Sequence, residues 1–209
     1  MSMSEREIKF LTRFIVESDA IENITADSQL VEAQLKRKKR RGYVGAMLLL
    51  ESLALKKNKI ITENLICRVQ GLITAEQHNK PGGPKLKQEW IGRYRLIDVS
   101  IGGRVAPSPA FTPSLMESWI LSVAIWQKTY SQYLPNVNIR NIAIFHYEYE
   151  RIHPFVDGNG RSGRALVSYL MRYCGIQPFV FTSGDKYETY YRCFNNKETM
   201  CKYFEAKVI

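Results

Sequence analysis

The sequence predicts a mostly α-helical protein with one short β-hairpin. Apolar residues recur at spacings of three and four along most of the chain, and proline and glycine signals bound these stretches. Only one stretch combines β-prone residues with partial alternation. With 209 residues and 45% hydrophobic content, the chain can bury a sizeable core. We expect N-terminal helices over residues 1–60 and a core over residues 61–209, joined in one compact domain.

Two helical stretches are predicted before residue 60. The first carries an apolar stripe made of Ile8, Leu11, Phe14 and Ile15. The second spans residues 28–57 and includes six consecutive cations at residues 36–41. Such a run can bind nucleic-acid phosphates, steer an acidic protein target, or form a solvated helix face or a turn between helices. With a net charge of +10, a nucleic-acid-binding module is therefore the alternative function.

The middle of the chain predicts a loop, the hairpin and a long helix. Pro81-Gly82-Gly83-Pro84 is typical of a loop. Residues 94–101 suit a short hairpin that ends at Gly102-Gly103. Its candidate residues are Tyr94, Ile97 and Val99. Thr112-Pro113 is a cap and first-turn pair that begins a helix with an apolar, core-facing stripe.

A helix, a glycine-containing loop and a second helix follow. Residues 139–152 have helical spacing, and the next proline disfavours helix before it, so this helix should end near His153. Helical spacing resumes over residues 166–171 and stops at a glycine. We expect a last helix to begin near Ser183. Its tyrosines are Tyr187, Tyr190 and Tyr191.

The loop between these two helices carries the chemistry. His153 is the only nearby group that takes a proton near neutral pH. Asp157 suits Mg²⁺, which binds few carboxylates and keeps phosphate and water ligands. Residues 158–160 lead into a helix N-terminus, whose backbone N–H groups attract anions. Arg161 and Arg164 are three residues apart, share a helix face, and can bind one anion together.

Two other interpretations of this loop were weighed. Gly158-x-Gly160-x-x-Gly163 also fits the dinucleotide fingerprint, with Asp185 further along the chain. That fingerprint needs a strand directly before it, whereas a helix is predicted here. In the second interpretation, His153 and Asp157 cap helices and the arginines are solvated. It does not account for all these residues occurring together.

The string from His153 to Arg164 resembles the Fic family signature, His-x-Phe-x-[Asp/Glu]-Gly-Asn-Gly-Arg-x-x-Arg, at every specified position. The lead-in at residues 148–152 and the region from Gly92 to Pro109 are similar too, so the likeness covers roughly residues 90–205. The resemblance implies a Fic-type helical bundle with a hairpin flap. It also implies transfer of AMP from ATP, with Mg²⁺, to a Ser, Thr or Tyr hydroxyl of a target protein.

The resemblance further implies roles for individual side chains. His153 would deprotonate the target hydroxyl, and Asp157 would hold Mg²⁺ on the α- and β-phosphates. Arg161 would neutralise the leaving pyrophosphate, and Arg164 would hold the γ-phosphate. Such a division of labour fits a reaction in which positioning and charge neutralisation dominate.

The glycine loop would cradle the phosphates in this resemblance. The residues concerned are Gly158, Asn159 and Gly160, with Asn159 acting through its side chain as well. A phosphate-transferring branch of the family has residues like Ala-Asn-Lys-Arg in place of Gly-Asn-Gly-Arg. Both glycines are present here, which favours AMP transfer and leaves a Fic-type phosphotransferase as an alternative.

A second resemblance lies near the N-terminus. The string Ser18-Asp19-Ala20-Ile21-Glu22-Asn23 is similar to the inhibitory motif of the family, [Ser/Thr]-x-x-x-Glu-[Gly/Asn]. It implies that Glu22 pairs with Arg164, so that ATP binds unproductively until the pair opens. The string beginning at Ser28 nearly matches through Glu32, but Ala33 fails the last position.

The sequence gives fewer indications of the partners and of the cellular location. In Fic-like proteins the flap adds a strand to a target segment. The three tyrosines of this chain, Tyr187, Tyr190 and Tyr191, either wall the adenine or pack on the core. The four cysteines lack metal-ligand spacing, no apolar run approaches a membrane span, and the N-terminus has no signal-peptide pattern. We expect a cytoplasmic protein, with secretion as an effector and homo-oligomerisation left open.

Overall fold

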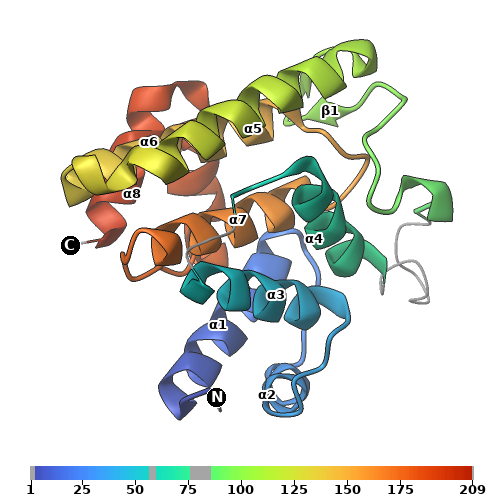
Figure 1. Ribbon diagram of the computed structural model, residues 1–209. Helices are drawn as coiled ribbons and strands as arrows, with labels where there is room; N and C mark the ends of the chain where they lie inside the picture. The colour runs from blue at the N-terminus through green and yellow to red at the C-terminus, as the bar shows by residue number, and fades with distance from the viewer. Residues whose placement is uncertain (1–2, 57–59, 76–85, 209) are drawn as a thin grey trace.

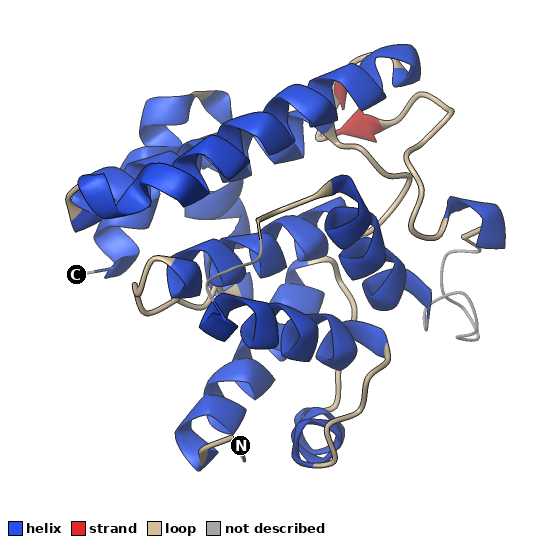
Figure 2. Ribbon diagram, in the orientation of Figure 1, coloured by secondary structure: helices blue, strands red, loops and turns tan. Residues whose placement is uncertain are grey.

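Helices dominate the computed structural model, which describes residues 3–56, 60–75 and 86–208. The helices are α1 (Glu5–Ile21), α2 (Ser28–Lys36), α3 (Gly42–Lys56), α4 (Glu63–Ala75), α5 (Thr112–Thr129), α6 (Pro135–Ile152), α7 (Asn159–Tyr173) and α8 (Lys197–Val208). Short 3₁₀ turns join several of them. Figure 2 shows the small antiparallel hairpin of β1 (Ser100–Ile101) and β2 (Arg104–Val105) among these helices. The predicted fold class is confirmed, and the predicted loop at residues 81–84 lies outside the described residues.

The core is built around α7. Thirteen of its residues are buried, and the helix packs against α3, α4 and α6. Figure 1 shows α7 in the middle of the molecule, between α3 on one side and α5 and α6 on the other. α6 in turn packs against α5 and α8. Because α6 and α7 are adjacent in both sequence and space, the loop that joins them is held from both ends.

The N-terminal helix α1 is amphipathic, as its apolar spacing predicts. Ser4 and Glu7 form a reciprocal capping box at its start, which satisfies two backbone donors that would otherwise lack partners. Its buried stripe includes Leu11, Phe14 and Ile15. α1 packs against α2, α3 and α7, so its C-terminal end lies beside the start of α7.

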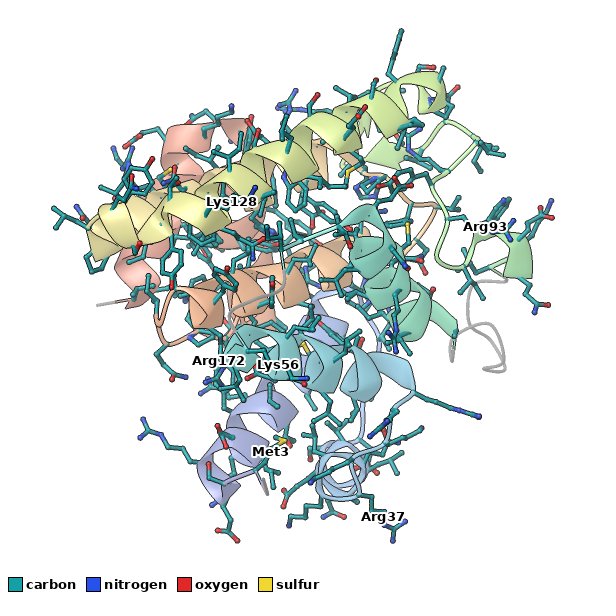
Figure 3. All side chains as sticks on the ribbon, in the orientation of Figure 1. Met3, Arg37, Lys56, Arg93, Lys128 and Arg172 are labelled. Carbon is teal, nitrogen blue, oxygen red and sulfur yellow. The ribbon has the colours of Figure 1, made fainter. Side chains whose placement is uncertain are left out.

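The basic run is a turn between two helices, which was one of its predicted forms. α2 ends at Lys36, and α3 begins at Gly42. The turn closes where the backbone N–H of Lys39 donates to the Gln34 carbonyl at 3.0 Å. Figure 3 shows Arg37 at the edge of the molecule, directed away from the helices. No helix in the described part of the chain is both long and apolar enough to cross a membrane.

The hairpin occurs, but later in the chain than predicted. The strands pair Ser100 with Val105 around the turn Gly102-Gly103, whose φ angles of 52° and 82° favour glycine. Tyr94 and Ile97 precede the strands, whereas the Val99 carbonyl accepts from the Ala106 N–H at 3.0 Å and continues the pairing, and the assignment of all three residues to the flap stays a prediction. Tyr94 instead packs its ring on Phe155, with centroids 5.6 Å apart. This contact helps to hold the segment before β1 as a loop.

The segment from Ser183 is helical, as predicted, but it is not a regular α-helix. Residues Ser183–Asp185 form a 3₁₀ turn, Lys186–Tyr190 a π-helical turn and Tyr191–Asn195 a second 3₁₀ turn before α8 begins. Hydrogen bonds from other residues anchor the start of this segment, where the first N–H groups of a helix lack partners within it. The Thr182 hydroxyl donates to Asp185 at 2.7 Å, and the Ser183 N–H donates to Glu17 of α1 at 2.7 Å.

Candidate active site

The candidate base, His153, stands at the C-terminal end of α6. It adopts a left-handed conformation with φ of 49°, which ends the helix where the following proline predicts. Its ring Nδ1 lies 3.3 Å from the Glu150 carbonyl oxygen. When Nδ1 carries the proton and donates there, Nε2 is the ring's proton acceptor. Burial lowers the pKa of His153 to about 4, so the ring is neutral at physiological pH.

The loop after His153 is shaped by Asn159. The Asn159 side chain accepts from the Phe155 N–H and donates to the Phe155 carbonyl, both at 2.9 Å. These two hydrogen bonds close the loop, and the phosphate contact that the family resemblance implies for this side chain stays a prediction. Gly158 has φ of 79°, and a Cβ there would lie 2.7 Å from a Thr74 methyl group, so only glycine fits.

The N-terminus of α7 offers backbone donors. Gly158 is its N-cap, and no side chain of the described residues caps this helix. The first-turn N–H groups and the helix dipole therefore favour an anion at this point. Gly160 in this turn faces the cavity that His153 also lines. The structure thus brings the predicted base and the predicted anion cradle together.

Arg164 is buried against α1, with 1% of its surface exposed. Its Nε donates to the Ser18 hydroxyl at 2.8 Å, and its Nη2 donates to the Ser18 carbonyl at 2.9 Å. Nη2 also forms an ion pair with Glu22 Oε1 at 2.8 Å. Tyr43 contributes to the same network, because its hydroxyl lies 2.8 Å from the Ser18 hydroxyl. Helix α1 therefore supplies acceptors for an arginine of α7.

Glu22 lies directly over the start of α7. A Cβ built on Gly160 would clash with Glu22 Oε1, so the carboxylate occupies the space that this glycine leaves. Burial raises the pKa of Glu22, but the attraction of Arg164 outweighs it, and the pKa lies below its usual value. Glu22 is thus ionised at neutral pH. A negative charge already sits where the helix N-terminus would hold an anion.

Arg161 and Asp157 face each other beside the loop. Arg161 Nη2 lies 3.5 Å from Asp157 Oδ2, and Nη1 lies 3.8 Å from Asp19 of α1. Arg161 is 2% exposed, whereas the Asp157 side chain is 35% exposed. The second arginine of the signature is therefore the one in direct contact with Glu22, and the first is held by carboxylates on both sides.

The donor set at Asp157 fits Mg²⁺. Within the described residues there is no cluster of three or more His, Cys, Asp or Glu side chains that would enclose a metal ion. Mg²⁺ needs no such cluster, because it binds through one or two carboxylates together with phosphate oxygens and water. Asp157 is a partly exposed carboxylate next to the anion cradle, so it suits such a metal ion.

Residues 60–171, more than half of the chain, match the model of the Fic/DOC family. The chain belongs to the Fic/DOC family. The match begins earlier than the resemblance predicted and includes α4, whose Gln70 side chain donates to the Asp157 carbonyl at 2.9 Å. This Fic domain therefore uses α4 to support the signature loop.

Curated relatives share the name protein adenylyltransferase Fic. The protein from Drosophila willistoni is 35% identical over 103 residues, which are 48% of this chain and 19% of that protein. The protein from Drosophila virilis is 35% identical over 103 residues and is covered to 20%. The chain thus spans about a fifth of the length of these relatives.

Solved structures share the fold. A Fic-domain-containing signalling protein from Bacteroides thetaiotaomicron superposes with a TM-score of 0.75 at 22% identity, over 97% of this chain and 84% of that one. Fic-1 from C. elegans gives a TM-score of 0.68 at 19% identity, over 100% of this chain and 63% of that one. The predicted Fic-type helical bundle is confirmed.

The main cavity of this Fic domain has a volume of about 790 Å³. Its lining comes from the hairpin, the ends of α1 and α6, the start of α7 and the segment 190–195. Of the three predicted tyrosines, Tyr190 and Tyr191 line it, whereas Tyr187 does not and is 66% exposed. Tyr190 is itself buried, and its hydroxyl lies 2.8 Å from Nε2 of His146. Tyr191 remains the more open candidate for an adenine contact.

Sequence reasoning missed Glu150 and Arg95. Glu150 lies on α6 three residues before His153, and its Oε2 is 4.0 Å from His153 Nδ1. Its helical spacing from the histidine was the available signal. Arg95 donates to the His153 carbonyl from a loop far back in the chain, and nothing local in the sequence marks it.

Proposed function

We propose that this Fic domain transfers AMP from ATP to a Ser, Thr or Tyr hydroxyl of a target protein. One observation carries the proposal. A neutral histidine and an uncapped helix N-terminus with a buried arginine converge on one cavity. The names of the curated relatives support the same activity.

His153 acts as the general base in this proposal. Its Nε2 takes the proton of the target hydroxyl as the hydroxyl oxygen attacks the α-phosphorus of ATP. The bond from that phosphorus to the bridging oxygen breaks, and pyrophosphate leaves. The products are a phosphodiester between AMP and the protein, pyrophosphate, and a protonated His153. Burial of His153 keeps the ring in its neutral, proton-accepting form at the start of each turnover.

The phosphates are held by charge and by backbone donors. The N–H groups of the first turn of α7 receive phosphate oxygens, and Arg161 lies beside them to offset the charge of the leaving pyrophosphate. Asp157 would hold Mg²⁺, which when bound neutralises phosphate charge. Both glycines of the loop are present, which supports AMP transfer over the phosphotransferase alternative.

Glu22 inhibits the reaction in this proposal. The γ-phosphate of a productively bound ATP needs the guanidinium of Arg164, and in this structure Glu22 and Ser18 occupy it. The Glu22 charge also repels the phosphate. Because α1 belongs to the same chain, inhibition does not depend on a second protein.

The hairpin receives the target. Gly102, Arg104 and Val105 line the cavity, and Val105 is 75% exposed. An exposed strand can pair with an extended target segment through main-chain hydrogen bonds, which tolerates varied target sequences. Such pairing would bring a hydroxyl of the target toward His153.

Transfer to cellular proteins tests the proposed function. The Glu22→Gly variant is incubated with a cell lysate, Mg²⁺ and ATP labelled at the α-phosphate, and labelled proteins are identified by mass spectrometry. Peptides carrying AMP on a hydroxyl side chain are expected, and Glu22→Gly with His153→Ala should yield none. Equal labelling by both variants would contradict the proposal.

A further inference from the structure

Arg95 is a buried cation whose guanidinium, among the residues that the structure describes, donates its hydrogen bonds to main-chain oxygen atoms. It is 1% exposed, and each hydrogen bond that the structure gives its guanidinium goes to a backbone carbonyl. Removing a charge from water is costly, and a carboxylate is the usual partner for a buried arginine. The Asp98 charge attracts this cation, but the hydrogen bonds of the guanidinium go to carbonyls, which indicates that these carbonyls must be kept together.

Two of these carbonyls belong to the end of α6. Arg95 Nε donates to the His153 carbonyl at 2.8 Å, and Nη2 donates to the Ile152 carbonyl at 3.4 Å. The Arg95 backbone N–H donates to the Pro154 carbonyl at 2.9 Å. The last carbonyls of a helix lack partners within it, and a cation there is favoured by the helix dipole. Arg95 thus fixes the left-handed residue that carries the candidate base.

The other two carbonyls flank the hairpin. Nη1 of Arg95 donates to the Ile97 carbonyl at 3.1 Å, ahead of β1, and Nη2 donates to the Pro107 carbonyl, after β2. The entry and the exit of the hairpin are therefore tied to the same planar group that holds His153. A displacement of the hairpin relative to His153 would break bonds at both ends of this group.

We propose that Arg95 is a positioning residue that sets the placement of the target-docking hairpin relative to His153. The inference rests on the proposed function, in which the hairpin presents a hydroxyl to His153. Misplacing reacting atoms by about 1 Å can slow a reaction by roughly 100-fold. Lysine cannot replace this arginine, because its donors radiate from one nitrogen and do not form a rigid fork.

The test compares Arg95→Lys with Arg93→Lys, both in the Glu22→Gly background. Arg93 lies in the same segment, and Figure 3 shows it at the edge of the molecule, directed outward. Transfer of AMP onto the protein itself, here called self-modification, is followed with α-labelled ATP. Binding of Mg²⁺-ATP is measured by calorimetry. Arg95→Lys should slow self-modification by about 10- to 100-fold with unchanged ATP binding, whereas Arg93→Lys should change neither. Equal rates in the two variants would overturn the proposal.

Hydrogen exchange gives a readout that does not depend on activity. Backbone amides of residues 99–106 should exchange faster in Arg95→Lys, with no change in the middle of α7. Unchanged exchange in the hairpin would contradict a tie between hairpin and histidine, and faster exchange throughout α7 would show a general structural role instead. If Glu22→Gly alone shows no transfer, the proposed function fails, while this measurement still decides whether Arg95 holds the hairpin.

A double-variant cycle tests whether Arg95 acts through the hairpin or independently of it. Gly103→Val strains only the exposed turn, because its φ is 82° and no other group lies within 4 Å of the added Cβ. If Arg95 acts through the hairpin, adding Arg95→Lys to Gly103→Val should slow self-modification much less than Arg95→Lys does alone. Fold-changes that simply multiply would show that Arg95 acts elsewhere.

Discussion

At the scale of single residues, the proposed chemistry depends on His153. Replacing His153 with alanine should slow AMP transfer in the Glu22→Gly background by about 10²–10⁴-fold, the usual cost of losing a general base. Binding of Mg²⁺-ATP should remain, because the histidine acts on the target hydroxyl. Transfer rates test the expected loss of activity, and calorimetry on the same preparation tests the retained binding of Mg²⁺-ATP. Full activity would show that another group takes the proton.

The pH dependence of transfer reports the same histidine. Burial lowers its pKa to about 4, and the nearby Arg95 cation acts in the same direction. The neutral base is present above that pKa and is lost as pH falls through it. The acidic limb of the rate–pH profile of Glu22→Gly should therefore lie near pH 4. A limb near 6.5, the usual histidine value, would mean that His153 is solvated during the reaction.

Glu150 predicts a pH dependence of stability. Burial raises its pKa to about 8, although Arg164 pulls it down, so the folded protein keeps a proton that the unfolded chain releases above its ordinary pKa of 4.5. Between these values the folded state binds more protons, and stability falls as pH rises. Glu150→Gln should remove that fall. Thermal unfolding at pH 5 and pH 8 tests this, and an equal pH dependence in both proteins would contradict it.

Residue roles were only partly predictable from the sequence. The signature string located His153, Asp157 and both arginines, because its chemistry is local. The loop-closing bonds of the Asn159 amide were not predictable, because spacing does not reveal this geometry. Arg95 acts through contacts across the fold, which neighbouring residues do not reveal, whereas the helical spacing of Glu150 from His153 indicated proximity but not its burial.

At the scale of elements, the proposed inhibition by α1 acts through the end of that helix, where Glu22 pairs with Arg164. Glu22→Gly should raise self-modification strongly, because Arg164 is freed without removal of a catalytic group. Glu32→Gly on α2 is the matched control, since Glu32 pairs with the exposed Lys36 and not with the site. Activation by the Glu32 change alone would mean that the wrong glutamate was assigned.

The gain from Glu22→Gly should depend on Arg164. Adding Arg164→Ala should remove most of it, because both residues act on one contact. Initial rates of the single and double variants measure this. A double variant as active as Glu22→Gly would show that Glu22 inhibits by another route.

Element boundaries were predictable where proline and glycine set them. α5 begins at Thr112 and α6 ends before His153, as their sequence signals indicate. The hairpin was placed too early because Tyr94 and Arg95 are held by Phe155 and by distant carbonyls, which override β propensity. The segment from Ser183 begins where predicted, but apolar spacing does not reveal that its turns are 3₁₀ and π-helical.

At the scale of the whole molecule, the site is assembled from the two ends of the sequence. α1 lies against α7, and the segment between α7 and α8 closes the same region, where Lys186 donates to Asn23 at 3.2 Å. The division at residue 60 into N-terminal helices and core stays a prediction. Both parts contribute to the cavity, and α3 of the first part packs against α7, so removal of residues 1–60 should destabilise the core that holds the signature loop.

The central claim is that the α-phosphorus of ATP is the atom attacked. Glu22→Gly is incubated with Mg²⁺ and ATP labelled at the α-phosphate, and in parallel with ATP labelled at the γ-phosphate. Label from the α-phosphate should appear on the protein and label from the γ-phosphate should not, with His153→Ala abolishing the signal. Incorporation of γ-label would contradict the account and indicate a phosphotransferase.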